Sequence, residues 1–317
     1  MTPTQLRAFA AIARHGSARA AADELGVSEA AIASHTAALR KELDDPLYQR
    51  AASGLSFTPG GLRLATRAVE LLGLQDQTRQ EVFAANRGQR ILRLATTSLF
   101  AEYAAPGLIE LFKTRAADLE VEMSVHQSDR LWDLLAARGA DVAIAPAKPH
   151  RDGLRTHEFL KYQLILVVGG RHRLAGSRCE PAALRSETWM LGPSALDPRG
   201  ATAKLLARFE VPEARQRIFQ SHGAAISEVK AGRGVAVVPE FRVRSEIADG
   251  GLFRISTNGD SAAGLWAATT LLPSQTSAVG AELMRFITTP RATQAMLAGS
   301  GANIAHFRPS VHVTLWN

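Results

Sequence analysis

Hydroxyl side chains follow two predicted strands at the points where each strand ends. Thr97-Ser98 comes directly after the strand expected over residues 91–96, and Ser128 follows the strand expected over 119–125. In open α/β sheets, small ligands bind at the carboxyl ends of strands, beside helix N-termini whose free N–H groups favour anions. Any one of these hydroxyls could instead be only a helix cap. The pattern therefore predicts a site for a small anion, provided that the fold brings the hydroxyls together.

The remaining chemistry-bearing residues do not form a recognisable catalytic or metal site. Gly232-Arg233-Gly234 lacks the third glycine of a dinucleotide fingerprint, and the nine histidines are scattered without ligands at zinc spacing. No G-x-S-x-G motif occurs, and no Ser/His/Asp order stands out. Cys179 is the single cysteine, so no disulfide can form within the chain. We expect no catalytic residue, no metal and no cofactor.

Length and composition favour a soluble protein of at least two domains. The chain has 317 residues, which is more than one compact core usually holds, and 46% of them are hydrophobic and 21% charged. The net charge is +7, but residues 1–57 carry six Lys/Arg against six Asp/Glu, so bulk charge does not argue for DNA binding there. Neither a signal peptide nor a long apolar run is evident, so we expect a cytoplasmic protein with no membrane partner.

The elements that could position a nucleic-acid reader begin near the N-terminus. Ser17 can cap a helix that reaches Leu25, Gly26 ends that helix, and Ser28 can cap a second helix that runs to about Leu43. Two short helices joined by such a turn form a helix-turn-helix, whose second helix can enter a major groove. The same arrangement occurs in many helical proteins, so on its own it leaves DNA binding open.

Two short strands are predicted after the second helix. They cover residues 46–50 and 55–60 and flank a tip of small residues at 51–54. Such a pair of strands is a wing. The N-terminal sixty residues therefore read as a winged helix-turn-helix.

A run of motifs extends through this N-terminal stretch. The matched residues are Leu6, Phe9, Gly16, Ser17, Ala21, Ala22, Leu25, Val27, Ser28, Ala31, Ile32, Leu39, Leu43, Pro46, Leu47, Tyr48, Arg50, Thr58 and Gly61. They resemble the winged domain of the LysR-type transcriptional regulators. Arg40 is a departure, because the family usually has Glu at that position. With the layout of the remaining chain, the resemblance extends to about residue 290.

The resemblance implies a fold class and a division into domains. It implies an α/β protein with an all-α-dominated winged helix-turn-helix domain at residues 1–60. A two-lobed, periplasmic-binding-protein-like α/β effector domain would follow at 91–290. The further divisions are a linker (dimerisation) helix at 61–87, lobe I at about 91–161 and 269–290, lobe II at about 162–268, and a C-terminal extension of unknown role at 291–317.

A long apolar stripe runs through residues 61–86. A helix of this length needs a surface against which to bury such a stripe. In the resembling family the linker helix pairs with its copy in a second subunit, which implies a homodimer or homotetramer. Packing on the chain's own second domain is the alternative. A dimer would place two recognition helices about one helical turn apart on double-stranded DNA.

The resemblance also indicates which residues face DNA. Glu29, Ala30, Ala33 and Ser34 lie where the family reads base edges, although Gln, Pro, Ser and Arg are commoner there. Glu29 could accept from a cytosine amino group, or it could only favour the helix start. The full predicted DNA-binding set is Ser17, Arg19, Ser28, Glu29, Ala30, Ala33, Ser34, His35, Arg40 and Arg50.

By the same resemblance, hydroxyls of the second domain match positions that hold an effector's carboxylate. The predicted effector-binding set is Thr97, Ser98, Ser128, Pro193, Ser194, Ser221 and His222. We therefore predict a sequence-specific DNA-binding transcriptional regulator of LysR type, controlled by a small-molecule effector that we expect to be anionic. The alternatives are a non-specific DNA-organising protein and, with less support, an α/β enzyme.

Overall fold

The computed structural model describes residues 1–51, 54–116, 118–147, 151–198 and 200–298. It divides into two units, Met1–Arg87 with Ala136–Gly139, and Gly88–Leu135 with Ala140–Asn317. Each unit has its own hydrophobic core. None of the helices among the described residues is both long and apolar enough to cross a membrane.

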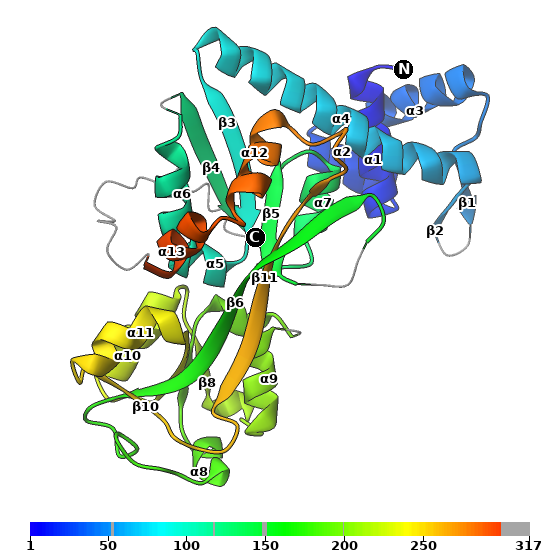
Figure 1. Cartoon of the computed structure of the whole chain (residues 1–317). Helices are drawn as coiled ribbons and strands as arrows, with labels where there is room; N and C mark the ends of the chain where they lie inside the picture. Colours follow the sequence, from blue (N-terminus) through cyan, green and yellow to red (C-terminus); the bar gives the residue numbers. More distant parts are fainter. Residues whose placement is uncertain (52–53, 117, 148–150, 199, 299–317) are drawn as a thin grey trace. The chain divides into compact units, whose positions relative to one another are not determined.

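The first unit is a winged helix-turn-helix followed by one long helix (Figure 1). Each of its four helices begins after a Ser or Thr whose hydroxyl accepts a hydrogen bond from a backbone N–H three residues on. Gly26, with φ 63°, ends α2 and makes the tight turn before α3. The elements are α1 (Pro3–His15), α2 (Ala18–Leu25), α3 (Glu29–Leu43), β1 (Tyr48–Ala51), β2 (Gly54–Phe57) and α4 (Pro59–Asn86).

The wing is fixed to the helices by an aromatic cluster. The Phe9 ring of α1 is fully buried, and its centroid lies 6.4 Å from the ring of Tyr48 in β1 and 6.2 Å from that of Phe57 in β2. Leu39 of α3 is fully buried in the same cluster. Because these rings come from α1 and both wing strands, the wing and the recognition helix α3 share one core.

A second set of contacts fixes the base of the wing. The Asp45 carboxylate accepts from the Leu47 N–H at 2.6 Å and from the Thr58 hydroxyl at 2.7 Å. Gly61 packs against the same segment so closely that an added Cβ would lie 1.9 Å from the Leu47 carbonyl oxygen. Glycine at this position therefore lets the start of α4 lie directly on the strand leading into the wing.

The second unit is built on one mixed sheet in the order β4-β3-β5-β11-β6-β9-β7-β8, with β10 added beside β6. Two long antiparallel strands, β6 and β11, run side by side through both lobes (Figure 1). The lobes attach parallel strands at either end of this ribbon. The strands are β3 (Arg90–Thr96), β4 (Leu119–Val125), β5 (Val142–Pro146), β6 (Leu154–Gly169), β7 (Trp189–Leu191), β8 (Gln216–Ile218), β9 (Val235–Pro239), β10 (Leu252–Arg254) and β11 (Ser261–Leu271).

Helices cover both faces of the sheet. In the first lobe, Leu94 and Ile144 face the main core beneath α5 and α6, whereas the alternate residues Ala95 and Ala143 pack with Leu131 of α7. The helices are α5 (Ser98–Tyr103), α6 (Ala105–Lys113), α7 (Leu131–Ala136), α8 (Pro181–Arg185), α9 (Ala201–Arg208), α10 (His222–Lys230), α11 (Glu240–Ala248), α12 (Ala278–Phe286) and α13 (Pro290–Ala298), with the 3-10 turns η1 (Pro193–Leu196) and η2 (Glu213–Arg215).

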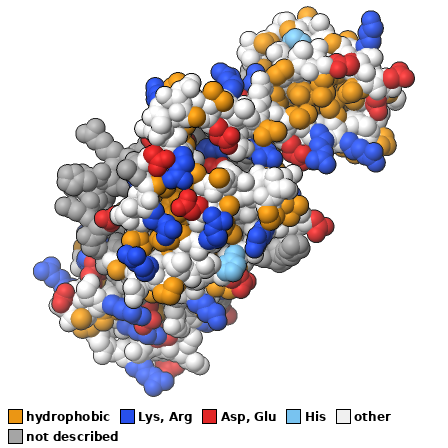
Figure 2. Space-filling model, turned by 45° about the horizontal axis from the view of Figure 1, so that its top comes forward, with side chains coloured by type: hydrophobic (Ala, Val, Ile, Leu, Met, Phe, Trp, Pro, Cys, Tyr) orange, Lys and Arg blue, Asp and Glu red, His pale blue; other side chains and the backbone are white. Residues whose placement is uncertain are grey.

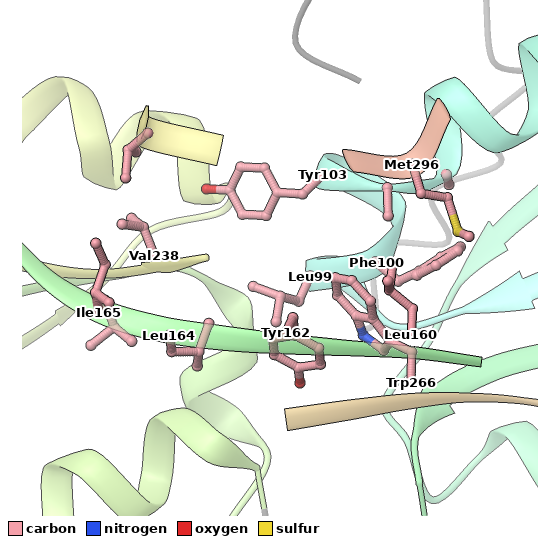
Figure 3. Close-up of a cluster of buried hydrophobic side chains, with 14 of the residues drawn as sticks. Leu99, Phe100, Tyr103, Leu160, Tyr162, Leu164, Ile165, Val238, Trp266 and Met296 are labelled. Carbon is pink, nitrogen blue, oxygen red and sulfur yellow. The ribbon is translucent and has the colours of Figure 1, made fainter. Parts of the chain in front are cut away.

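Aromatic side chains connect the lobes where the long strands cross between them. The Trp266 ring of β11 is stacked on the Tyr162 ring of β6 at 4.1 Å and meets Phe100 of α5 edge-on at 5.1 Å. Figure 3 shows Leu99 and Phe100 on α5 beside Tyr162 and Trp266. Helix α5 is therefore held against the strands that join the two lobes.

The expected fold class is confirmed, and the structure adds detail to it. Two helices, α5 and α6, cover residues 98–113 and are separated at Ala104, ahead of a proline in the first turn of α6. Strand β6 begins at Leu154 and pairs with β11 over residues 154–165, so residue 162, where lobe II was expected to begin, lies inside this strand. The start of the C-terminal extension forms α13, whose Met296 is fully buried, and residues 299–317 lie outside the described residues.

Candidate functional site

The recognition helix α3 has one buried face and one exposed face. Ile32 and Leu39 are fully buried and Thr36 nearly so. The four residues predicted to face bases, Glu29, Ala30, Ala33 and Ser34, lie outside this buried set. A helix anchored on one side with small side chains on the other can approach a groove closely.

Two of the predicted DNA-binding serines also have structural roles. Ser17 caps α2 by accepting from the Ala20 N–H at 3.4 Å, and Ser28 caps α3 by accepting from the Ala31 N–H at 3.2 Å. Both lie at helix N-termini, where backbone N–H groups favour a phosphate. The cap and a phosphate contact are compatible, because a hydroxyl that accepts from the backbone still has its own proton to donate.

The predicted basic and imidazole side chains divide into exposed and engaged groups. Arg19 and Arg50 are exposed, and His35 is half-buried. Arg40 is engaged within the domain, since its Nη2 donates to the Tyr48 carbonyl at 2.9 Å and its guanidinium lies 4.5 Å from the Tyr48 ring centroid. The Arg40 guanidinium therefore joins α3 to the wing, and the DNA-binding role predicted for Arg40 stays a prediction.

A cavity of about 510 Å³ lies in the second unit, at the strand ends of both lobes. Five of the seven predicted effector-binding residues line it, namely Thr97, Ser98, Ser128, Pro193 and Ser194. Its other polar lining residues include His126, Gln127, Arg130, Asp197 and Thr202, and its apolar ones include Leu99, Val125, Tyr162, Leu164 and Leu196. The cavity is therefore lined by both polar and apolar side chains.

Two hydroxyls in this cavity differ in how they are bonded. Ser128 donates to the Asp197 carboxylate at 2.8 Å, which joins the first lobe to the second. The Thr97 hydroxyl oxygen is buried and has no hydrogen-bond partner among the described residues. A buried hydroxyl without a partner costs free energy unless a ligand or water meets it. Thr97 is therefore a lining residue whose hydroxyl makes no hydrogen bond with the described residues.

The charged and titratable side chains of the cavity lining are Arg130, Asp197 and His126. Arg130 lines the cavity beside His126. Burial, together with the positive charge of Arg130, lowers the pKa of His126 below its ordinary value. His126 is consequently neutral at neutral pH and can donate or accept a hydrogen bond without adding charge.

Ser221 and His222 do not lie where we predicted them. Neither lines the cavity. Ser221 caps α10 by accepting from the Ala224 N–H at 3.1 Å, and the His222 side chain is only 2% exposed. His222 lies behind Ser194, with its Nε2 2.9 Å from the Ser194 Oγ. The imidazole therefore contacts a lining residue instead of the cavity itself.

Glu102 of α5 completes this contact from the other lobe. Its carboxylate lies 2.9 Å from His222 Nδ1 and accepts from the backbone N–H groups of His222 at 2.8 Å and Gly223 at 2.5 Å. Glu102 and Asp197 were both missed by sequence reasoning, because each acts on a residue distant along the chain. Arg130 could have been predicted at the cavity, because it lies only two residues after Ser128.

Glu102 gives the contact between the lobes a predictable pH dependence. Burial alone would raise its pKa, but hydrogen bonds from His222 and Gly223 outweigh burial and hold the pKa below its ordinary value of 4.5. Its contribution to the free energy of unfolding is therefore complete above that ordinary value and is lost as the pH falls through the lowered folded-state pKa. We expect the stability difference between the wild type and Glu102→Gln to shrink from about pH 6 to about pH 3. Denaturant unfolding checks this, and a constant difference would contradict it.

Two family models match this chain. The model for the bacterial regulatory helix-turn-helix protein of the lysR family matches residues 3–62, and the LysR substrate binding domain model matches residues 85–285. An uncharacterized HTH-type transcriptional regulator from Mycobacterium tuberculosis is 51% identical over 321 residues, covering 100% of both chains.

Solved structures of similar proteins share the fold. A full-length OxyR from Pseudomonas aeruginosa is 19% identical with a TM-score of 0.56, covering 93% of this chain and 94% of that one. CbnR, a LysR family transcriptional regulator, is 21% identical with a TM-score of 0.56, covering 93% of this chain and 99% of that one. At these identities the likeness is one of fold alone.

Proposed function

The chain belongs to the LysR family of transcriptional regulators, and from that premise we propose that a small anionic effector, bound in the cavity of the second unit, changes its binding to operator DNA. The protein is a DNA-binding regulator, not an enzyme, and regulators of this family act as oligomers under effector control. We further propose that it acts in the cytoplasm as a homodimer or homotetramer.

The proposed oligomer rests on the exposed apolar side chains of α4. Leu71, Leu74 and Val82 are 43%, 44% and 57% exposed and lie along one side of this 28-residue helix. Figure 2 shows hydrophobic side chains side by side on the surface of the part formed by residues 1–87, with Lys, Arg, Asp and Glu around them. A second copy of α4 would cover this row and bring two α3 helices to the two halves of a dyad-symmetric operator.

The proposed effector site rests mainly on the hydroxyl of Thr97, which has no partner among the described residues. It lies in a cavity that also presents Ser98, Ser128 and the positively charged Arg130. Such a set suits a carboxylate, which accepts hydrogen bonds from hydroxyls and is attracted by a cation. The apolar lining residues suit a short hydrocarbon or aromatic portion of the same molecule. Binding that favours one arrangement of the lobes would shift the population of the regulator between two states.

Thr97→Val tests this effector site without disturbing the fold. The Thr97 hydroxyl makes no hydrogen bond with the described residues, so its removal breaks none of them. Thr97→Val should therefore unfold at the wild-type temperature in the absence of ligand. A small carboxylic acid that raises the unfolding temperature of the wild type should bind the variant about 10-fold more weakly, from a loss of about 1–1.5 kcal/mol. Thermal-shift titration across small organic acids measures this. Thr288→Val, at an exposed threonine outside the cavity, is the control, and equal losses in both variants would move the site elsewhere.

The DNA contact of the wing is tested with Arg50→Ala. Arg50 is exposed on β1, so its replacement should leave stability unchanged. If it meets a phosphate, the variant should bind all duplexes more weakly, and the slope of log affinity against log salt should fall by about 1 for each phosphate that the protein no longer neutralises. The binding assay uses the intergenic DNA upstream of the protein's own gene and a random duplex. Arg215→Ala, at an exposed arginine of the second unit, controls for the change of charge. An unchanged slope for Arg50→Ala would exclude the contact.

Preference for the intergenic DNA separates a regulator from a DNA-organising protein. Specific regulators bind their sites about 10³-fold or more tightly than other duplexes. Equal binding of the wild type to both duplexes would favour the organising role.

A further inference from the structure

Ser194, His222 and Glu102 form a continuous hydrogen-bonded chain at the wall of the cavity. The Ser194 Oγ lies 2.9 Å from His222 Nε2, and His222 Nδ1 lies 2.9 Å from the Glu102 carboxylate. Ser194, His222 and Glu102 come from η1, α10 and α5, so these hydrogen bonds form only in the folded protein. A nucleophile within hydrogen-bond reach of a base, which a third group orients, is the arrangement of serine acyl-transfer sites.

The imidazole is held in place on several sides. Gly192 lies so close to it that an added Cβ would stand 2.3 Å from a ring carbon, so only glycine leaves room for the ring. The Tyr103 ring packs against it with a centroid distance of 5.4 Å. Glu102 is in turn fixed by the backbone N–H groups of His222 and Gly223. The base therefore points at Ser194 without needing to reorganise.

The hydrogen-bond directions follow from the chemistry of the three groups. An ionised carboxylate can only accept, so the proton between Glu102 and His222 must lie on Nδ1. When the imidazole carries only this proton, Nε2 is an acceptor and the Ser194 hydroxyl donates to it. The Thr202 hydroxyl, 3.2 Å from the Ser194 Oγ, can donate to the serine oxygen in the same network. In this assignment the serine proton already points toward a base.

The surroundings of Ser194 suit an acyl compound. Ser194 lines the cavity together with Leu99 and Leu164, which can contact a short acyl chain. Ala201 and Thr202, at the first turn of α9, line the same cavity, and Gly200 offers no side chain to cap that helix. The N–H groups of a first helical turn lack partners within the helix, so they can stabilise a developing oxyanion.

We propose that Ser194 takes up one acyl group per chain from an activated ester or thioester. The Ser194 Oγ forms a bond to the carbonyl carbon and its proton passes to His222 Nε2. The bond from that carbon to the leaving oxygen or sulfur then breaks, and His222 returns the proton to give a free alcohol or thiol. Ser194 carries an acyl ester at the end of this step. The reaction is stoichiometric, and it requires neither DNA nor the effector binding proposed above.

The full-length protein treated with p-nitrophenyl acetate tests the proposal. We expect release of one nitrophenolate per chain and, by peptide mass spectrometry, one acetyl group on the peptide that contains Ser194. Ser194→Ala should lose both signals. Ser227→Ala, at an exposed serine of α10 outside the cavity, should keep both. Acetylation that is confined to other residues, or that persists in Ser194→Ala at the wild-type rate, would overturn the proposal.

The roles of His222 and Glu102 are tested by rates. His222→Gln should slow acetylation of Ser194 by at least about 100-fold, the usual contribution of a general base. Since this buried residue also supports the fold, Glu102→Gln and Glu102→Asp provide a second comparison. As a positioning residue, Glu102 should lower the rate when replaced by Gln and restore much of it when replaced by Asp. A rate in Glu102→Gln equal to that of the wild type would show that the chain of hydrogen bonds is only structural and would refute the mechanism.

Discussion

Leu74→Glu is expected to separate the protein into monomers and to weaken operator binding by about 100-fold or more. Leu74 is 44% exposed on α4, in the same row as Leu71 and Val82. If a second α4 covers this row, the substitution places a carboxylate without a partner in an apolar interface, which costs several kcal/mol. Because a monomer contacts only one half of a dyad-symmetric operator, the loss of the dimer also removes one of two sets of DNA contacts. Analytical ultracentrifugation and DNA titration measure the two effects.

The matched control for this variant is Gln80→Glu. It also lowers the charge by one, and residue 80 lies about 120° to 180° around α4 from Leu71, Leu74 and Val82. Gln80 is exposed, so its replacement should leave both the oligomer and the DNA affinity close to those of the wild type. A Leu74→Glu protein that still sediments as an oligomer would place the subunit interface on another surface.

Features encoded by neighbouring residues could be predicted from the sequence. Two serines, Ser17 and Ser28, each cap a helix by accepting from an N–H three residues on, and Gly26 makes the turn between the helices. These roles follow from local chemistry. The cavity hydroxyls were also predictable, because Thr97 and Ser128 closely follow strands of a sheet whose carboxyl ends meet. These predictions needed only periodicity, caps and the rule for strand ends.

Features that depend on distant residues could not be predicted in the same way. His222 was expected at the cavity rim by resemblance to the family, yet its imidazole is buried against Glu102, which is 120 residues away in the chain. The contact of Arg40 with the carbonyl and the ring of Tyr48 was not expected either. In each case the competing partner belongs to another element, and its position is set only by tertiary packing.

The contacts between the two lobes indicate where a ligand could act on the second unit. Its two lobes share long strands, so their cores cannot move independently along β6 and β11. Polar contacts also join the lobes, Ser128 with Asp197 at the cavity and Glu102 with His222 outside its lining. A ligand that competes for the Ser128 hydroxyl or the Asp197 carboxylate would act directly on one of these contacts.

Ala33→Glu is expected to weaken specific DNA binding by about 100-fold or more while leaving the unfolding temperature unchanged. Ala33 is exposed on α3, between the buried residues Ile32 and Thr36, so a longer side chain meets no part of the core. In the groove the new carboxylate would exclude the close approach that alanine permits and would be repelled by the phosphates. Loss of even one base contact costs about 1–3 kcal/mol, and the repulsion adds to it.

Ala37→Glu separates the base-reading role from a general effect of negative charge. Ala37 is also exposed and lies one turn further along the same face of α3. The N-terminal residues of a recognition helix make most base contacts. The fold-loss in affinity caused by Ala37→Glu should therefore be less than about a tenth of the fold-loss caused by Ala33→Glu. A smaller loss at Ala37, with equal salt dependence in both variants, would mean that the first turns of α3 enter the groove. Equal losses at both positions would mean that only the phosphates repel the added charge, and α3 would then lie across the groove without reading bases.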